Sequence, residues 1–543
     1  MCGFFVDTGS GVEKGILETV SNTINYRGPD ASMNWTHGDR HLFFHRLAIM
    51  DASASGMQPF VLPGKLALVC NGEIYNEPQL KAEFPNYSFQ SSSDCEVLIP
   101  MLLRYGIEKM VVKLDAEFAF AIYDMERDCF FAGRDPLGIR PLFYGAAKTN
   151  GKMMFASEAK ALQRLCEGIK PFPPGHYFDG ETGHFHMFKD LTDVKSHHGE
   201  HISTAECQIR ELLVNAVEKR LRSDVPVGFL LSGGLDSSLV CSIASRILDK
   251  PLTTFSVGIT KDPIDTSYAR DVAKFLGTKH HEVLFTREEV FEALPTVIYH
   301  LETWDITTIR ASIGMYLLCK YIRESTDIRV VLTGEVSDEI FGYKYTDYAP
   351  SAEAFQKEAE KRVQELHVYD VLRADRCISA HGLEARVPFG DTEFVDYVIG
   401  IAPGMKMNTT GIGKYLLRKA FDGGDFLPEH ILYREKAAFS DAVGHSMVDE
   451  LKAMSERTIS DQELLEAKNI YPENTPFSKE ALMYRKIFDD HFPELGHLTP
   501  SYWMPNREWE NCDVMDPSAR VLPNYGASGG THSICKENKR VAV

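Results

Sequence analysis

The segment Ser232-Gly-Gly-Leu-Asp-Ser-Ser238 carries the strongest chemical signal in the sequence. Two glycines let the backbone approach an anion, N–H groups at a helix start point toward it, and the serines add hydroxyl donors. No lysine follows the glycines, so this is not the common G-x-x-x-x-G-K-[ST] loop, and Asp236 would repel phosphate unless a cation intervened. We expect a phosphate cradle with Mg²⁺ between Asp236 and the phosphates; the alternative is a strand-to-helix turn with capping serines.

A second acidic segment, Thr333-Gly-Glu-Val-Ser-Asp-Glu339, follows the apolar run at 329–332. If that run is a strand of the same parallel sheet, both loops lie at one sheet edge. Asp338 could then complete the metal site. The alternative is a solvated acidic helix start, which the helix dipole stabilises.

Cys2 is the one cysteine whose position suggests chemistry. Removal of Met1 would leave its thiol beside a free α-amino group, whose pKa of about 7.7–8.0 suits a base near neutral pH. An incidental thiol near the terminus is the alternative. The eleven cysteines show no Cys-x-x-Cys spacing, and His197, His198 and His201 lie in a polar stretch without partner cysteines, so we expect no zinc site.

The second half of the chain supplies elements that could position the two loops. Short apolar runs predict buried strands, and amphipathic stretches between them predict helices. Alternation of strand and helix predicts a parallel sheet with helices on both faces and ligands beyond the carboxyl ends of the strands. The expected strands are 225–231, 253–259, 281–285 and 329–332, and the expected helices include 239–248, 267–276 and 313–323. After Glu353 the pattern is mainly helical.

The first half has a different texture. Short aromatic-rich segments broken by turn residues favour strands, with a helix at 94–105 between them. A polar stretch without periodicity then separates this β-rich layered part from the alternating part. The expected strands are 3–6, 41–44, 66–69, 118–123, 129–132 and 153–156.

Composition limits the class of ligand. The chain of 543 residues is 44% hydrophobic and has 58 basic against 77 acidic residues, a net charge of −19. This balance argues against non-specific binding to nucleic acid or to an anionic membrane, and the basic cluster Lys219, Arg220 and Arg222 is expected to be a solvated helix face. The longest clean apolar run, 225–231, is far short of the ~18–20 residues of a membrane span. We expect a cytoplasmic protein with small-molecule ligands.

Ordered motifs carry a resemblance to a known family. The segment from Ser232 to Ser238 resembles the pyrophosphate loop of the N-type ATP pyrophosphatases, and the chain from Cys2 to about Asp516 resembles the glutamine-hydrolysing asparagine synthetases. The further motifs are Cys2-Gly3, Arg27-Gly-Pro-Asp30, Asn71-Gly-Glu-Ile-Tyr-Asn76, Gly133-Arg-Asp135, Glu302-Thr-Trp-Asp-Ile-Thr-Thr-Ile-Arg310, Glu384-Ala-Arg-Val-Pro-Phe389, Arg434-Glu-Lys436 and Phe439-Ser-Asp441.

The resemblance implies the domain organisation. An α+β layered (αββα) N-terminal-nucleophile glutaminase domain would occupy residues 2–185, followed by a linker at 186–205. An α/β parallel-sheet ATP pyrophosphatase domain with a mainly helical C-terminal part would occupy 206–516. Residues 517–543 are expected to be a poorly ordered tail, and the family resemblance suggests a homodimer.

For the first domain the resemblance implies a glutaminase. Cys2 would attack the side-chain amide of glutamine, while the Asn71 amide and the Gly72 N–H stabilise the oxyanion. The full set of expected glutamine-binding residues is Arg46, Leu47, Ile49, Asn71, Gly72, Glu73 and Asp94, with Arg46 on the α-carboxylate and the two acids near the α-amino group. Taken alone, Asn71-Gly72 could be a hairpin turn and Arg46 a surface ion pair.

For the second domain the resemblance implies attack of aspartate on the α-phosphorus of ATP, giving β-aspartyl-AMP and pyrophosphate, which ammonia then converts to asparagine and AMP. Glu335 would accept a proton from the ammonia and Lys436 would contact the reacting phosphate. Mg²⁺ would lie between Asp236 and Asp338. The expected ATP-binding residues are Leu231, Ser232, Gly233, Gly234, Asp236, Ser237, Ser238, Val257, Thr333 and Gly334, and Thr307, Thr308 and Arg310 would lie near aspartate and phosphate.

Two consequences follow from the resemblance. Ammonia in neutral water is mostly ammonium, so the two sites need a dry passage between the domains. Val336 stands where the family has a glycine, and a β-branched residue does not easily adopt the positive φ open to glycine.

Two alternative functions would share parts of the motif pattern: a cyclase-like enzyme that adenylates another carboxylate, and an inactive relative that acts as a nutrient sensor.

Overall fold

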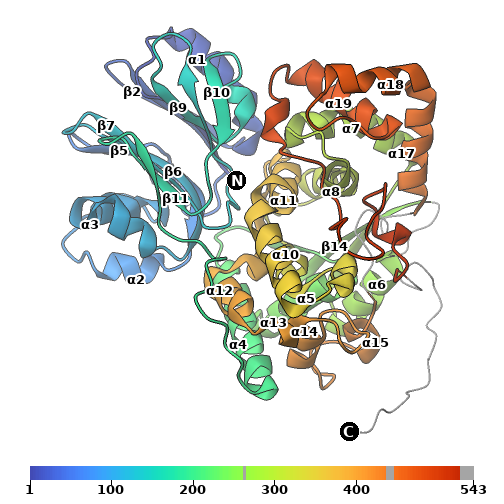
Figure 1. Ribbon diagram of the computed structural model, residues 1–543. Coiled ribbons are helices and arrows are strands. Elements are labelled where there is room, and N and C mark those ends of the chain that lie inside the picture. Colours follow the sequence, from blue (N-terminus) through green and yellow to red (C-terminus); the bar gives the residue numbers. More distant parts are fainter. Residues whose placement is uncertain (261–264, 436–444, 526–543) are drawn as a thin grey trace.

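The computed structural model describes residues 1–260, 265–435 and 445–525. Figure 1 shows two halves side by side with the N-terminus between them, and the described residues form three sheets. The predicted residues Lys436, Phe439 and Asp441 lie outside the described residues. Among the described helices none is long and apolar enough to cross a membrane.

The first half is built from two antiparallel sheets. Aromatic and aliphatic residues point inward from both and form a shared core, for example Phe44 and Phe155 from one sheet and Val69 and Phe130 from the other. One sheet has the order β10 (Cys166–Pro171), β8 (Phe143–Ala147), β9 (Met153–Ala156), β1 (Gly3–Asp7), β3 (Arg40–Arg46), β2 (Ala31–His37); the other has β12 (His184–Met187), β11 (His176–Asp179), β7 (Cys129–Arg134), β6 (Ala116–Asp124), β5 (Leu66–Ile74), β4 (Phe60–Leu62).

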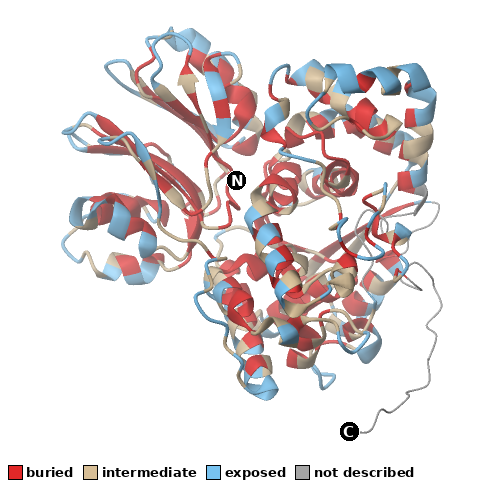
Figure 2. Ribbon diagram, viewed as in Figure 1, coloured by how far each residue is buried: buried red, intermediate tan, exposed pale blue. Residues whose placement is uncertain are grey.

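Helices cover the outer faces of both sheets. Helix α1 (Lys14–Ser21) packs Leu17 and Val20 against the first sheet, and α3 (Leu98–Val112) packs on the second together with α2 (Glu77–Ala82). Figure 2 shows the strands mostly buried and the outward faces of these helices exposed. The expected αββα layering is therefore confirmed.

The second half centres on a parallel sheet. Its order is β15 (Lys279–Phe285), β14 (Thr253–Ile259), β13 (Val227–Leu230), β16 (Val330–Leu332), β17 (Glu384–Arg386). All four pairings are parallel, and the three-residue strand β17, which the sequence did not reveal, closes the edge nearest the first half.

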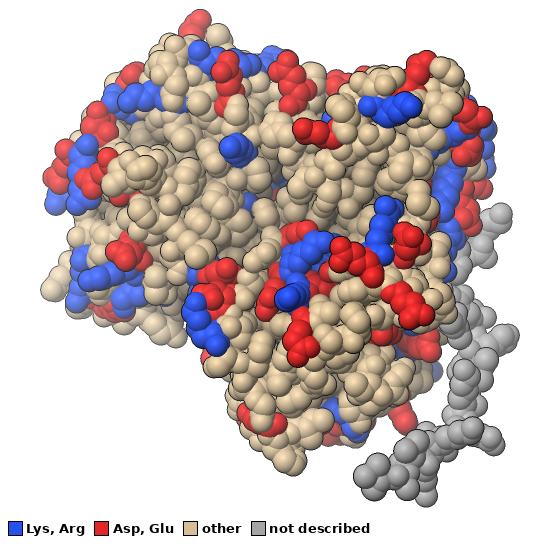
Figure 3. Space-filling view, viewed as in Figure 1, with Lys and Arg blue, Asp and Glu red and all other residues tan. Residues whose placement is uncertain are grey.

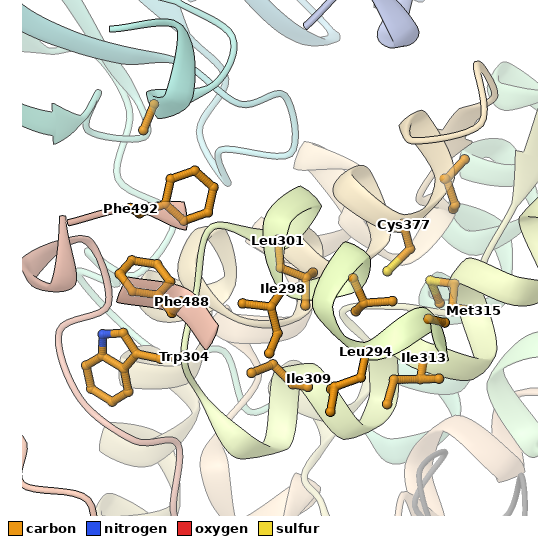
Figure 4. Packing of buried hydrophobic residues seen from close by; sticks show 14 of the residues in the cluster. Leu294, Ile298, Leu301, Trp304, Ile309, Ile313, Met315, Cys377, Phe488 and Phe492 are labelled. Carbon is orange, nitrogen blue, oxygen red and sulfur yellow. The ribbon is translucent and has the colours of Figure 1, made fainter. Parts of the chain in front are cut away.

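Alternate residues of the sheet face two sets of helices. Val330 and Leu332 pack with α4 (Ile202–Arg220), α5 (Leu235–Ile247) and α6 (Asp265–Leu276), while Val331 packs with the opposite layer. That layer consists of α7 (Arg287–Leu301), α8 (Ile306–Ser325) and α11 (Asp370–Ser379). Figure 4 shows its packing, with Phe488 and Phe492 near the end of α19 (Lys479–His491) closing one side.

The remaining helices form the C-terminal part of the second half. They follow the order α9 (Ser337–Phe341), α10 (Ala352–Glu365), α12 (Thr392–Gly400), α13 (Pro403–Lys406), α14 (Tyr415–Ala420), α15 (Glu429–Leu432), α17 (His445–Thr458) and α18 (Asp461–Ile470). This agrees with the mainly helical pattern predicted after Glu353.

Buried ion pairs join the two halves. Arg27 contacts Asp375 at 2.8 Å, and Arg376 contacts Glu158 at 2.7 Å. Each pair takes one partner from each half. Removing one partner of such a buried pair typically costs about 3–5 kcal/mol, because it leaves an uncompensated charge.

Arg220 corrects one expectation. It is only 2% exposed, and it contacts Glu117 of β6 at 2.9 Å and Asp391 at 3.0 Å. The interpretation of its cluster as a solvated helix face is therefore wrong for this residue. Figure 3 shows acidic and basic side chains interspersed over the described part of the face in view, with no extended basic area.

The segment boundaries differ slightly from those expected. Strand β12 continues to Met187, and α4 already begins at Ile202, so the connection is shorter at both ends than 186–205. His198 of this connection donates its backbone N–H to Gly400. Residues 517–525, expected in the tail, contain the 3-10 turn η9 (Ala519–Val521) and bury Leu522, whereas residues 526–543 are outside the described part.

Candidate functional site

A small pocket beside Cys2 brings together the whole set of residues expected to bind glutamine. Its cavity measures about 30 Å³. Glu384 of β17 also borders it, so the second half contributes to this pocket. From the expected set it is lined by Cys2, Arg46, Leu47, Ile49, Asn71, Gly72, Glu73 and Asp94.

Cys2 lies directly before β1, and its sulfur accepts a hydrogen bond from the Leu47 N–H at 3.4 Å. Desolvation by burial raises the pKa of its thiol to about 11, so the group is a neutral thiol at neutral pH and needs a base to become a nucleophile. The α-amino group here belongs to Met1: it is buried, donates to the Leu383 carbonyl at 3.0 Å, and its pKa is lowered by desolvation to about 5. Only removal of Met1 would give Cys2 the expected base.

Asn71 and Gly72 lie within β5, paired with Ala119 and Phe118 of β6, so the hairpin alternative is wrong. A side chain at Gly72 would clash, because a Cβ there would lie 2.6 Å from the Glu117 carbonyl oxygen. The Asn71 side chain is 1% exposed, and its Nδ2 has no hydrogen-bond partner within the described residues. A buried unsatisfied donor in a pocket is costly unless a ligand accepts its hydrogen bond.

The charged residues of the small pocket are held in place by the backbone and by the other half. Arg46 is 6% exposed and donates to the carbonyls of Ser53 and Asp51, so it is not a surface ion pair. Asp94 accepts the Ile74 N–H at 2.7 Å, and burial raises the pKa of its carboxyl. Glu73 contacts Arg386 of β17 at 3.1 Å.

A much larger pocket, of about 630 Å³, lies at the carboxyl ends of β13 and β16. Of the expected ATP-binding residues, Gly233 and Ser238 are not part of its lining. Glu335, Asp338 and Thr307 do line it. The expected residues that line it are Leu231, Ser232, Gly234, Asp236, Ser237, Val257, Thr333 and Gly334.

Glycines allow the two loops of this pocket to meet. Gly233 has φ +73°, and a Cβ there would lie 2.4 Å from the backbone N of Ala269. A Cβ on Gly334 would lie 2.8 Å from the Ser237 N. The N-cap of α5 is Gly234 without a side-chain cap, so the alternative of a simple serine-capped turn is not what the structure shows.

Asp236 and Asp338 share a cation from a third element. The Lys414 ammonium lies 2.7 Å from Asp236 Oδ1 and 2.6 Å from Asp338 Oδ1, and it donates to Ser337 Oγ at 2.9 Å. Lys414 precedes α14 and adopts φ +55°. This lysine was not predicted from the sequence, because a single lysine in a loop has no pattern to distinguish it.

These carboxylates fit a magnesium ion only in company with phosphate. Oxygen donors suit Mg²⁺, and both acids already lie against one positive charge. The described residues contain no group of three or more His, Cys, Asp or Glu side chains that could hold a metal ion. An ion between Asp236 and Asp338 would therefore take its other ligands from phosphates and water.

Glu335 and Val336 follow directly in the second loop. Glu335 contacts Arg373, which also lies 3.2 Å from Asp370. Val336 is buried and has φ +81°, the left-handed conformation that the glycine of the family would adopt without strain. A β-branched residue there stores on the order of 1–3 kcal/mol of strain.

The residues expected near aspartate and phosphate separate into two groups. Thr307 lines the large pocket, whereas Thr308 caps α8 by hydrogen bonds with Asp305 at 2.8 Å. Arg310 is 3% exposed, contacts Glu480 at 2.6 Å, and reaches Asp516 at 2.9 Å. Its guanidinium therefore ties the C-terminal segment to α8 in the described structure.

That C-terminal segment forms part of the large pocket, a position that no sequence pattern predicted. Trp503, Pro517, Ser518, Ala519 and Asn524 all line it. Their sequence is polar and rich in turn residues, so it offered no periodic signal.

Comparisons with known proteins cover both halves. A family model described as glutamine amidotransferase domain matches residues 1–191, and one described as asparagine synthase matches 208–357 and 344–516. A probable glutamine-hydrolyzing asparagine synthetase of Acanthamoeba polyphaga mimivirus is 41% identical, covering 96% of this chain and 100% of the relative. Glutamine-hydrolyzing asparagine synthetases of Zea mays and Bos taurus are 39% and 40% identical, covering 98% and 97% of this chain and 95% and 100% of their own.

Proposed function

The chain belongs to the family of glutamine-hydrolysing asparagine synthetases, and on this premise we propose which residues carry each step. The protein is a ligase that makes asparagine with glutamine as nitrogen donor and ATP as co-substrate. Strand β17 reaches the small pocket at Glu384, and Thr333, directly after its partner strand β16, lines the large pocket; this observation carries the proposal that the two pockets act in sequence.

In the small pocket, Cys2 attacks the side-chain amide carbon of glutamine, and the C–N bond breaks to release ammonia. Water then hydrolyses the thioester to glutamate and regenerates the thiol. The thiol must lose its proton to attack, and the α-amine of Cys2, freed by removal of Met1, is the proposed base. The Asn71 Nδ2 donor and the Gly72 N–H stabilise the oxyanion. The unsatisfied, buried state of Asn71 Nδ2 supports this role, because the oxyanion supplies the missing acceptor.

Arg46, Asp94 and Glu73 select glutamine in that pocket. Arg46 binds the α-carboxylate, and the two acids bind the α-ammonium group. Because Glu73 already pairs with Arg386 at 3.1 Å, the α-ammonium group competes with a cation from the second half. Leu47 and Ile49 line the apolar part.

In the large pocket, aspartate attacks the α-phosphorus of ATP and pyrophosphate leaves onto the 232–238 loop. Leu231, Val257, Thr333 and Gly334 hold the adenosine, and Thr307 lies toward the aspartate. Glu335 takes the proton from the attacking ammonia, and its contact with Arg373 holds the carboxylate in position at the pocket. Lys436, outside the described residues, is the proposed contact to the reacting phosphate.

Mg²⁺ is proposed to be held by Asp236 and Asp338 together with the phosphates. When bound, it neutralises charge that develops on the leaving pyrophosphate. Lys414 keeps the two carboxylates together before the nucleotide arrives, since its ammonium lies within 2.7 Å of both. A homodimer and a cytoplasmic location remain predictions.

The proposed route of ammonia runs along the β16–β17 pair. Glu384, the first residue of β17, lines the small pocket. The Thr333 N–H, at the end of β16, donates to the Arg386 carbonyl at 3.1 Å, and Thr333 lines the large pocket. A dry path along this pair would keep ammonia unprotonated on its way between the sites.

The deciding experiment supplies amide-¹⁵N glutamine, aspartate and ATP to the purified protein. Labelled asparagine with one AMP per asparagine supports the proposal. Formation of ADP would refute adenylation. Pyrophosphate release with another carboxylate, but not with aspartate, would instead indicate a cyclase-like relative, and ligand binding without turnover would indicate a sensor.

A further inference from the structure

The C-terminal segment 503–525 lies along the large pocket, far in sequence from the loops that build its floor. Figure 1 shows this segment in red, between α8 and α17. Pro517, Ser518 and Ala519 border the cavity at consecutive positions. Trp503 begins the segment, and its carbonyl accepts a hydrogen bond from Thr307 of α8 at 3.4 Å.

Asp516 is the strongest anchor of the segment. Its Oδ1 lies 2.9 Å from Arg310 Nη1, and its Oδ2 contacts the Lys452 ammonium of α17. The same Oδ1 accepts the backbone N–H of Ser518 at 2.7 Å. These charge-assisted contacts hold the pKa of Asp516 well below its usual range. One carboxylate thus orients the Pro517–Ser518 turn against two helices.

Two further anchors follow within eight residues. Arg520 contacts Asp449 of α17 at 2.5 Å. Asn524 donates to the Lys344 carbonyl at 2.7 Å and to Asp347 at 3.1 Å, both in η5 (Lys344–Tyr348). The segment is therefore tied at both ends, to α8 and α17 on one side and to η5 on the other.

Apolar contacts fill the space beneath the segment. Leu522 is 3% exposed and packs with Trp509 and Tyr345. Ala519, 2% exposed, packs with Tyr525 and Tyr343. The polar contacts and the apolar contacts together fix residues 516–525 in place, because both sets must break before the segment can move.

We propose that residues 516–525 form a water-excluding wall of the synthetase pocket, and that Asp516 is the positioning residue that holds this wall against α8. The inference rests on the proposed function, because it concerns the fate of the β-aspartyl-AMP formed there. Water can attack the β-carbonyl carbon of this mixed anhydride. The C–O bond to phosphate then breaks, giving aspartate, AMP and a proton, with a net conversion of ATP and water to AMP and pyrophosphate.

A fixed wall suppresses this side reaction by keeping the pocket dry until ammonia arrives. Arg310 of α8 holds Asp516 about one helical turn from Thr307, which lines the pocket at the end proposed for aspartate. The anhydride carbon therefore forms next to the wall. Loosening the wall should release pyrophosphate without making asparagine.

The test measures this leak directly. Full-length wild type, Asp516→Asn, Asp516→Ala and Arg520→Gln are supplied with aspartate, ATP·Mg²⁺ and ammonium in H₂¹⁸O, so that the glutaminase site is not needed. We expect pyrophosphate per asparagine to stay near one in the wild type and to rise about three- to tenfold in Asp516→Ala, with smaller rises in Asp516→Asn and Arg520→Gln. Attack at the carbonyl should place ¹⁸O in recovered aspartate rather than in AMP.

Controls separate a leak from damage to the fold. Glu508→Gln changes an exposed acid of the same segment that does not line the pocket, and its ratio should match the wild type. Glutamine hydrolysis at Cys2 reports whether each variant is folded. Asp516→Glu keeps the negative charge, so its ratio of pyrophosphate to asparagine should lie closer to one than that of Asp516→Ala.

The proposal would be overturned if asparagine synthesis fell in Asp516→Ala while the ratio of pyrophosphate to asparagine stayed near one. It would also be overturned if that ratio rose without ¹⁸O appearing in aspartate. In either case Asp516 would only stabilise the domain. If Asp516→Ala does not fold, the same criterion applies to Asp516→Asn and Arg520→Gln. A wild type that forms no pyrophosphate would instead refute the proposed function and leave no leak to explain.

Discussion

The two pockets differ in how they are built. The small pocket, about 30 Å³, draws its key donors from the interior of strand β5, whereas the large one, about 630 Å³, is made of loops at the ends of parallel strands and a distant C-terminal segment. The first is proposed to bind glutamine as its one organic substrate, so it can be small and largely closed. The second must admit ATP, aspartate and ammonia, and its walls come from many elements.

In both pockets, nevertheless, carboxylates are paired with a lysine or an arginine of the protein itself. Glu73 in the small pocket pairs with Arg386, and Asp236 and Asp338 in the large one pair with Lys414. In each, an internal cation stands where a substrate cation or Mg²⁺ is proposed to bind. Substrate binding thus exchanges one ion pair for another instead of exposing a bare charge in a desolvated site.

Cys2→Ala is the variant expected to separate the activities of the two pockets most clearly. Asparagine synthesis from glutamine should fall more than about 1,000-fold, because no other nucleophile replaces the thiol. Synthesis from added ammonium should stay within about twofold of the wild type. Both rates are measured by asparagine formation; loss of both would mean that the two sites are not separable.

Asp338→Asn should act on the large pocket alone. Removing one of the two carboxylates proposed to bind Mg²⁺ should lower pyrophosphate release about 100-fold with either nitrogen source. Glutamine hydrolysis should continue. Asp513→Asn, at an exposed acid, is the matched control, and an equal loss in that variant would remove the special role of Asp338.

Acid should weaken the contact between the halves. His300 of α7 packs edge-on against Tyr26 of the first half, with ring centroids 4.5 Å apart, and desolvation lowers the pKa of His300 to about 3. The unfolded chain binds a proton below about pH 6.5 while folded His300 stays neutral, so this contribution to stability is complete above about pH 6.5 and is lost toward pH 3.

The expected loss from this histidine is about 2 kcal/mol between pH 6.5 and pH 5. Melting temperatures should therefore fall less steeply over this range in His300→Gln than in the wild type. His197→Gln, at an exposed residue of the connection, should keep the wild-type slope. Equal slopes in all three proteins would show that His300 does not contribute.

The smallest effect is expected at Val336. Replacement by glycine removes about 2 kcal/mol of burial but also relieves about 1–3 kcal/mol of strain, so stability should change by no more than about 1 kcal/mol. Val331→Gly, buried in β16, lacks the strain relief and should lower the melting temperature much more. A similar drop in both would mean that Val336 is not strained.

Sequence patterns were most informative where a segment is buried along its length or at regular intervals. Strands β9 and β14 were predicted with the bounds observed, because each is a continuous buried run. Strand β17 was missed because Glu384-Ala-Arg386 looks polar; its charged side chains find partners in the folded protein, among them Arg140, Glu73 and each other. Arg220 was misjudged for the same reason.

In the candidate site too, local sequence motifs were predictable and contacts made only by tertiary packing were not. Motif positions such as Cys2, Asn71 and Asp94 meet in one pocket, as expected, because each stands beside a recognisable strand or turn. Lys414 and the segment 516–525 reach the large pocket through tertiary packing alone. No local spacing connects them with Asp236, so a single sequence could not place them.

The ion pairs between the halves limit how this protein could be recombined. A first half expressed alone would lose the cations Arg386, Arg220 and Arg376 that pair with Glu73, Glu117 and Glu158. The same holds for a first half fused to a foreign synthetase that lacks those arginines. The unit that can be exchanged is therefore the two halves together, and a glutaminase grafted onto another ligase would need cations at the positions of Arg220, Arg376 and Arg386.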